Sequence, residues 1–81
     1  PNYADAYHNL ANVYQQINQL DLAITHYQKA LKFNPGLWSS HQQLAIIYLK
    51  QKEIDLAKEE LQKVLEINPN DQQAKKLLLM L

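Results

Sequence analysis

Two stretches of the chain repeat each other: residues 4–37 read ADAYHNLANVYQQINQLDLAITHYQKALKFNPGL, and residues 38–71 read WSSHQQLAIIYLKQKEIDLAKEELQKVLEINPND. Without a gap, they share Leu10/Leu44, Ala11/Ala45, Tyr14/Tyr48, Asp21/Asp55, Leu22/Leu56, Ala23/Ala57, Gln28/Gln62, Lys29/Lys63, Leu31/Leu65, Asn34/Asn68 and Pro35/Pro69. Pro1 extends the same spacing backwards. A fixed period of this length is the sequence signature of stacked supersecondary units, which present extended surfaces to partners.

Composition narrows the class of protein. The 81 residues allow one small domain with a thin core. Eight lysines balance eight acidic residues, so no basic field would attract nucleic acid or an anionic membrane. Cysteine is absent from the sequence, which excludes disulfides and thiolate metal sites.

The ends of the sequence give an expectation about its compartment. The longest apolar run, residues 77–81, is far shorter than the roughly 20 residues of a membrane span. The chain begins with Pro1 rather than methionine and shows no signal peptide. We therefore expect an excised piece of a larger protein with a cytoplasmic location.

Apolar residues follow the helical period within each unit. Tyr7, Leu10, Ala11 and Tyr14 fall at positions i, i+3, i+4 and i+7 of one amphipathic stripe. No window alternates with the period of two that a half-buried strand requires. The sequence therefore predicts an all-α fold, with helices at about residues 4–17, 20–33, 38–51, 54–67 and 71–81.

Proline and asparagine mark the predicted helix ends. Pro35 and Pro69 disfavour the α conformation in the preceding residue, so each ends the second helix of its unit. Asn2 and Asn70 each follow a proline and are predicted to cap the next helix. Gly36 holds the same place in the middle unit and is predicted to be a weaker cap.

The pattern of residue types resembles the tetratricopeptide repeat, which has an aromatic residue, Leu, a small residue, Tyr, Ala, an aromatic residue, Ala and Pro at fixed places. The first unit matches with Tyr7, Leu10, Ala11, Tyr14, Ala23, Tyr27, Ala30 and Pro35. The second unit keeps Leu44, Ala45, Tyr48, Ala57 and Pro69. The resemblance implies a right-handed α-solenoid in one domain, residues 1–81, with helix–turn–helix repeats at 4–37 and 38–71 and a C-terminal capping helix at 71–81.

Departures from the family pattern leave alternatives open. His41 stands where an aromatic residue is expected, and Trp38 lies one helical turn before it. Trp38 either covers the apolar surface that His41 leaves or serves as an exposed anchor for a partner, since Trp is enriched at binding hot spots. Leu79 falls where a third unit needs a small residue, so the last helix resembles a cap more than half of a third repeat.

The outer face of the first helix in each unit is the predicted binding surface, because it points away from the buried stripe. The resemblance implies that this face lines a concave groove for an extended or helical peptide. The predicted groove residues are Asp5, His8, Asn9, Asn12, Gln15, Gln16, Ser39, Gln42, Gln43, Ile46, Leu49, Lys50, Gln73, Lys76 and Leu77. Side-chain amides both donate and accept, which suits a peptide backbone, although such a helix face also serves solubility alone.

The family resemblance also indicates which class of ligand is not expected. Some members hold a C-terminal carboxylate with a clamp of Lys and Asn side chains, and only Asn12 matches that clamp here. An acidic C-terminal tail is therefore not the expected ligand. The alternative function is structural: a segment of a longer array, or a homo-oligomer formed through the C-terminal helix with Leu77, Met80 and Leu81.

Catalytic and metal-binding chemistry is not expected. The histidines at 8, 26 and 41 fall on three predicted helices, without the i, i+4 spacing of a metal site, and His26 is expected to be solvated. Glu59 and Glu60 are adjacent and point in different directions, which makes a poor acid–base pair. We expect a non-enzymatic module that binds protein or peptide, without cofactor, metal, nucleic acid or membrane.

Overall fold

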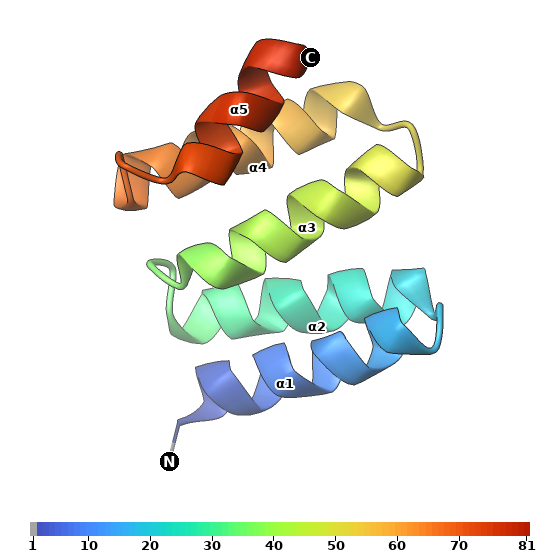
Figure 1. The fold of residues 1–81 in the computed structure, drawn as a ribbon. Helices are drawn as coiled ribbons and strands as arrows, with labels where there is room; N and C mark the ends of the chain where they lie inside the picture. Colours follow the sequence, from blue (N-terminus) through green and yellow to red (C-terminus); the bar gives the residue numbers. More distant parts are fainter. Residues whose placement is uncertain (1) are drawn as a thin grey trace.

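The computed structural model describes residues 2–81, which form five helices (Figure 1). They are α1 (Tyr3–Gln16), α2 (Leu20–Phe33), α3 (Trp38–Lys50), α4 (Ile54–Ile67) and α5 (Gln72–Met80). The helices stack in chain order, so the two chain ends lie at opposite ends of the array (Figure 1). The expected all-α solenoid of two helical hairpins and a C-terminal helix is confirmed, while Pro1 lies outside the described residues.

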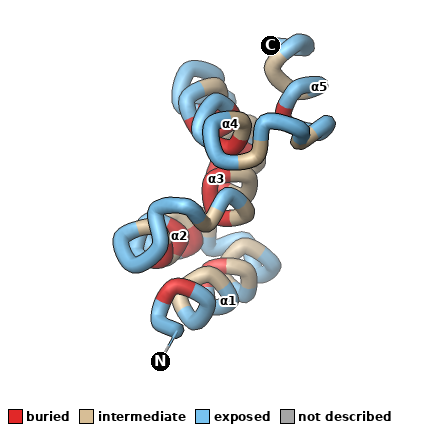
Figure 2. Tube along the Cα trace, turned by 90° about the vertical axis from the view of Figure 1, so that its left-hand side faces the viewer, coloured by how far each residue is buried: buried red, intermediate tan, exposed pale blue. Residues whose placement is uncertain are grey.

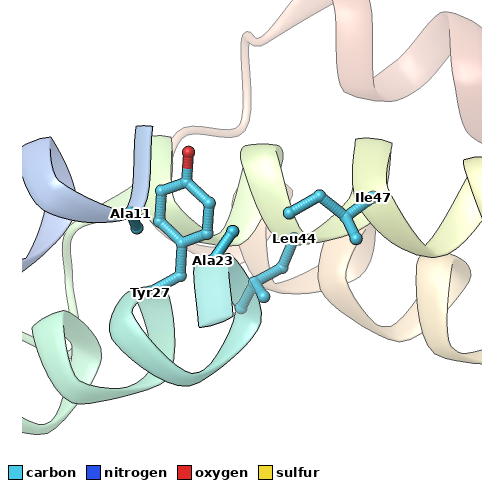
Figure 3. Packing of buried hydrophobic residues seen from close by; sticks show 5 residues of the cluster. All are labelled: Ala11, Ala23, Tyr27, Leu44 and Ile47. Atoms are coloured by element: carbon cyan, nitrogen blue, oxygen red, sulfur yellow. The ribbon is translucent and has the colours of Figure 1, made fainter. Parts of the chain in front are cut away.

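The first core lies where the hairpin of α1 and α2 meets α3. Ala11 and Ala23 are fully buried, and their small side chains allow the helices to approach closely. The ring of Tyr27 packs in the same cluster with Leu44 and Ile47 of α3 (Figure 3). The buried positions lie where neighbouring helices of the stack meet (Figure 2). Each large side chain buried here stabilises the fold by about 1.5–3 kcal/mol.

A second core joins α4 to α5. Leu61, Val64 and Ala74 are fully buried, and Leu77 and Leu78 pack against them while remaining partly open. Leu77 is predicted both for the groove and for self-association. Part of its side chain contacts the α4 core, because Ala74, Leu77 and Leu78 lie on one side of α5, and the rest remains open.

The second helix of each hairpin ends directly before an Asn-Pro pair, as predicted. Asn34 and Asn68 have φ of −142° and −130°, which is the extended backbone that a following proline favours. The predicted cap at Gly36 is wrong, because its N–H donates to the side chain of Asn34 at 3.1 Å within the turn. Leu37 takes the cap position of α3 without a side-chain hydrogen bond.

The other two predicted caps differ in outcome. Asn2 caps α1 and accepts from the backbone N–H of Asp5 at 3.2 Å, as predicted. The prediction for Asn70 is wrong, because the turn after Pro69 uses one more residue and α5 begins later. Asp71 is the cap and accepts from the backbone N–H of Ala74 at 3.0 Å.

The two hairpin turns have the same backbone geometry but different residues. Asn18 has φ of 62° and Lys52 has φ of 60°. Asparagine adopts this left-handed conformation at little cost, whereas lysine does so less readily. The turn between α3 and α4 therefore contains a strained residue.

His41 is buried, with 8% of its surface exposed, and so is Glu60 from α4. The Nδ1 atom of His41 lies 3.2 Å from both carboxylate oxygens of Glu60, and its N–H donates to them. Lys63 approaches the same carboxylate at 3.9 Å. A polar pair thus fills the place of the expected aromatic residue, while Trp38 keeps 37% of its surface exposed.

His26 is half-buried, so the expectation of a solvated side chain is wrong. Its ring packs against the rings of Tyr7 and Tyr14 of α1, with centroids 6.0 and 5.0 Å apart. Its Nδ1–H donates to the carbonyl oxygen of Leu22 at 2.8 Å. The hairpin brings this face of α2 against the aromatic side of α1, a contact that the period of α2 alone does not reveal.

Candidate partner-binding groove

Side-chain hydrogen bonds connect α1, α3 and α5 along the predicted groove face. The Nδ1 atom of His8 and the Oγ atom of Ser40 are 2.7 Å apart and join α1 to α3. The Nε2 atom of Gln42 donates to the Oε1 atom of Gln73 at 2.7 Å and joins α3 to α5. Every predicted groove residue remains at least partly open to solvent. These two bonds therefore tie successive helices of this face together, the first of them through the fully buried hydroxyl of Ser40.

A hollow of about 550 Å³ lies on this surface between α1 and α3, where both helices approach their C-terminal ends. Its lining residues are Asn12, Gln15, Gln16, Gln43 and Lys50, all members of the predicted groove. Other predicted residues do not line it: Asp5, His8, Asn9, Ser39, Gln42, Ile46, Leu49, Gln73, Lys76 and Leu77. The structure thus gathers four amides and one ammonium group around one depression.

The buried side chain of Tyr27 contacts two of these amides. Its ring is fully buried, and its hydroxyl contacts Oδ1 of Asn12 and, at 2.7 Å, Oε1 of Gln15 (Figure 3 shows the ring). Both partners are amide oxygens that accept, and a phenol has one proton, so the hydroxyl donates to only one of them at a time. Burial raises the pKa of Tyr27 to about 12, which keeps the hydroxyl protonated at neutral pH.

His8 is a neutral hydrogen-bonding group rather than a cation in this surface. Burial lowers the pKa of its imidazole from the usual 6.5, and the opposing attraction of Asp5 is smaller. The ring also packs at 5.3 Å from the ring of Tyr27. One ring nitrogen therefore donates and the other accepts at neutral pH.

Apolar side chains and one cation of α3 lie next to the hollow in the sequence. Lys50, which lines the hollow, is exposed. Ile46 and Leu49 are half-buried and precede Lys50 on α3. Within residues 2–81, no group of three or more His, Cys, Asp or Glu side chains is placed to hold a metal ion. None of the helices described is both long and apolar enough to cross a membrane.

The C-terminal end of the stack exposes apolar side chains. Leu79 and Met80 have 89% and 74% of their surface exposed, and Leu81 has 38%. Of the residues predicted for self-association, Met80 is therefore the most open, while Leu77 contacts the second core. Whether this end contacts another copy stays a prediction.

Sequence reasoning missed two residues that organise the groove. In the sequence, Tyr27 stands out only as an aromatic residue of the family pattern, yet a buried tyrosine hydroxyl needs a hydrogen-bond partner, and that need is a usable signal. Ser40 lies one period after Ala6, and its hydroxyl binds His8. A serine at a position where the other repeat has alanine indicates a possible hydrogen-bond partner, and this is the signal that could have found the contact.

Comparison with known families agrees with these repeats. Two family models described as tetratricopeptide repeat match the chain, one over residues 4–37 and the other over residues 38–71. No match is found among the curated proteins. Tetratricopeptide repeats are generally protein–protein interaction modules, and the family is typically non-catalytic.

Proposed function

Because the chain belongs to the tetratricopeptide repeat family, we propose that it binds an extended peptide segment of a partner protein along α1 and α3. The observation that supports this proposal most directly is the hollow of about 550 Å³ between α1 and α3. A concave surface with convergent polar groups is the usual form of a binding site.

The chemistry of the lining suggests how the segment is held. The amides of Gln16 and Gln43 donate and accept at once, so they can bind a peptide backbone whatever its sequence. Lys50 favours a carboxylate on the ligand. The hydrogen bonds of Tyr27 restrain Asn12 and Gln15 before binding, which reduces the entropy that binding costs.

Selection of peptides from a random display library against the chain, followed by calorimetry, tests this proposal. Gln43→Ala should weaken binding of the selected peptides by about fivefold, since a hydrogen bond contributes about 1 kcal/mol, and Lys50→Ala by about tenfold or more, since a hydrogen bond to a charged group contributes about 1.5–3 kcal/mol. Glu59→Ala, at an exposed position of α4, is the matched control. Equal affinity for all four proteins would reject the groove.

A second candidate function is self-association through the C-terminal end. It rests on Leu79 and Met80, whose exposed fractions of 89% and 74% are high for apolar side chains. Light scattering over a concentration series should then detect a dimer or larger species that Met80→Glu dissociates. A monomer at every concentration would exclude this function.

A further inference from the structure

A second hollow, of about 380 Å³, lies away from the groove, where α2 ends and α3 begins, and we call it the turn pocket. Its walls come from α2, α3, α4 and the turn between α2 and α3: Leu31, Pro35, His41, Lys63, Glu66 and Ile67. None of these residues lines the hollow of the groove, which lies toward the other end of α3. Sites for small ligands and single side chains have volumes from about 300 Å³ upward, so the turn pocket is large enough to be one.

His41 brings a polar atom to this pocket. The residue is 8% exposed, and its Nδ1–H donates to the carboxylate of Glu60. The other ring nitrogen, Nε2, makes no hydrogen bond with residues 2–81. Every fully buried side-chain nitrogen and oxygen in that range has a partner, so Nε2 is not fully buried and faces the hollow that His41 lines. In the neutral ring this nitrogen is an acceptor, and its complement is an N–H or O–H group.

The internal repeat shows which shape the turn pocket lacks. One period earlier, Tyr7 stands in the place of His41, and Phe33 stands in the place of Ile67. The rings of Tyr7 and Phe33 stack, with centroids 5.7 Å apart and planes inclined by 14°. An imidazole and a branched aliphatic chain are smaller than two six-membered rings, and the turn pocket lies beside them. The group that is missing from the second repeat is therefore a flat aromatic ring.

Charge at the turn pocket favours a neutral ligand over an ion. Lys63 and Glu66 line it with opposite charges, and Lys63 also lies 3.9 Å from the carboxylate of Glu60. Two aliphatic side chains and a proline complete the lining and offer apolar surface alone. An aromatic ring that carries one hydrogen-bond donor matches both the apolar walls and the free nitrogen of His41. Tryptophan and tyrosine side chains combine these two features.

We propose that the turn pocket is a second binding site, separate from the groove, that takes a tryptophan or tyrosine side chain of a partner protein. The ring lies against the apolar walls, and its N–H or O–H donates to Nε2 of His41. Glu60 fixes the tautomer that accepts at Nε2, so the acceptor is in place before the ligand arrives. A protein side chain is the expected source of the ring, because the repeats of this family are generally protein–protein interaction modules.

The test titrates the full ¹⁵N-labelled chain with N-acetyl-tryptophanamide, indole and 1-methylindole, followed by nuclear magnetic resonance. N-acetyl-tryptophanamide should shift the amide signals of His41, Lys63 and Ile67 until they saturate, and leave those of Gln43 and Lys50 unchanged. 1-Methylindole keeps the ring without the N–H donor, so it should bind about fivefold more weakly than indole, the effect of one hydrogen bond. The side-chain Nε2 signal of His41 should shift further with indole than with 1-methylindole.

Two variants of α4 complete the test. Ile67→Phe supplies a ring from the chain itself, as Phe33 does in the first repeat, and should abolish binding while circular dichroism shows an unchanged fold. Ile54→Phe is the matched control, because Ile54 begins the helix that Ile67 ends and has the same exposed fraction of 38%. This control should bind like the unchanged chain.

Three results would overturn the proposal. The first is the absence of saturable shifts at the turn pocket with every probe, or shifts confined to groove residues. The second is equal affinity for indole and 1-methylindole, which would remove the role of Nε2. The third is binding of indole without binding of N-acetyl-tryptophanamide, which would assign the pocket to a free small molecule rather than to a protein side chain.

Discussion

Replacing His41 with Leu should lower the free energy of unfolding by about 3 kcal/mol. A hydrogen bond to a charged group contributes about 1.5–3 kcal/mol, and a buried carboxylate left without that partner costs more. His41 and Glu60 are each 8% exposed, and Nδ1 lies 3.2 Å from both carboxylate oxygens. Without the imidazole, the carboxylate would keep only Lys63, at 3.9 Å and half in solvent.

This loss is large for so small a domain, whose total stability is expected to be about 4–12 kcal/mol. The melting temperature should fall by on the order of 10 °C or more. The decisive assay is a double-mutant cycle of His41→Leu and Glu60→Leu by urea unfolding. The double variant should be more stable than His41→Leu alone, because an apolar pair leaves no buried charge. Additive losses, within about 0.5 kcal/mol, would refute the coupling between the two side chains.

Three further perturbations test other parts of the structure. Lys52→Gly should raise the free energy of unfolding by about 0.5–1 kcal/mol in urea melts, because glycine adopts the left-handed φ of 60° at this position without the cost that lysine bears. Gln51→Gly is the control and should not raise it, because φ there is −86°. Tyr27→Phe should lower the free energy of unfolding by about 1 kcal/mol and lower the affinity for the peptides selected against the groove, because Asn12 and Gln15 lose their contacts with the hydroxyl. Unchanged affinity would show that the hydroxyl does not contribute to peptide binding. Burial lowers the pKa of His8 in the folded chain below its usual 6.5. Because the unfolded chain then binds a proton more readily than the folded chain, the stabilisation from neutral His8 is complete above pH 6.5 and is lost as the pH falls through the lowered pKa. Urea melts between pH 7.5 and 5 should therefore show a smaller decrease for His8→Gln than for the unchanged chain.

The sequence predicts the helices and their packing positions well, because these depend on local signals. The Asn-Pro pairs end α2 and α4 where expected, and Ala11 and Ala23 are fully buried where helices cross. The pairing of His41 with Glu60 was not predictable in the same way. A helical period tells which face of each helix is buried, but it does not tell which polar groups meet across two helices.

His26 shows the same limit. Its own helix gave no reason to bury it, and its position follows from the aromatic rings of Tyr7 and Tyr14 on α1. The cap of α5 depended on a single extra turn residue, which moved the helix start from the position suggested by Asn70 to one capped by Asp71. Contacts between elements and one-residue shifts at helix ends therefore required the coordinates.

Some positions keep the same residue in both repeats, and others differ between the repeats. The first kind includes packing positions, and the second includes the predicted groove. Ala11 and Tyr14 recur unchanged one period later as Ala45 and Tyr48, and both alanines are fully buried between helices. Along the groove face, Asn12, Gln15 and Gln16 are replaced by Ile46, Leu49 and Lys50. A surface used only for solubility has no need to become more apolar from one unit to the next. If the groove binds a peptide as proposed, that peptide meets amides on α1 and then apolar side chains and a cation on α3. Its own sequence should therefore be asymmetric, with polar residues over α1 and an apolar residue and a carboxylate over α3.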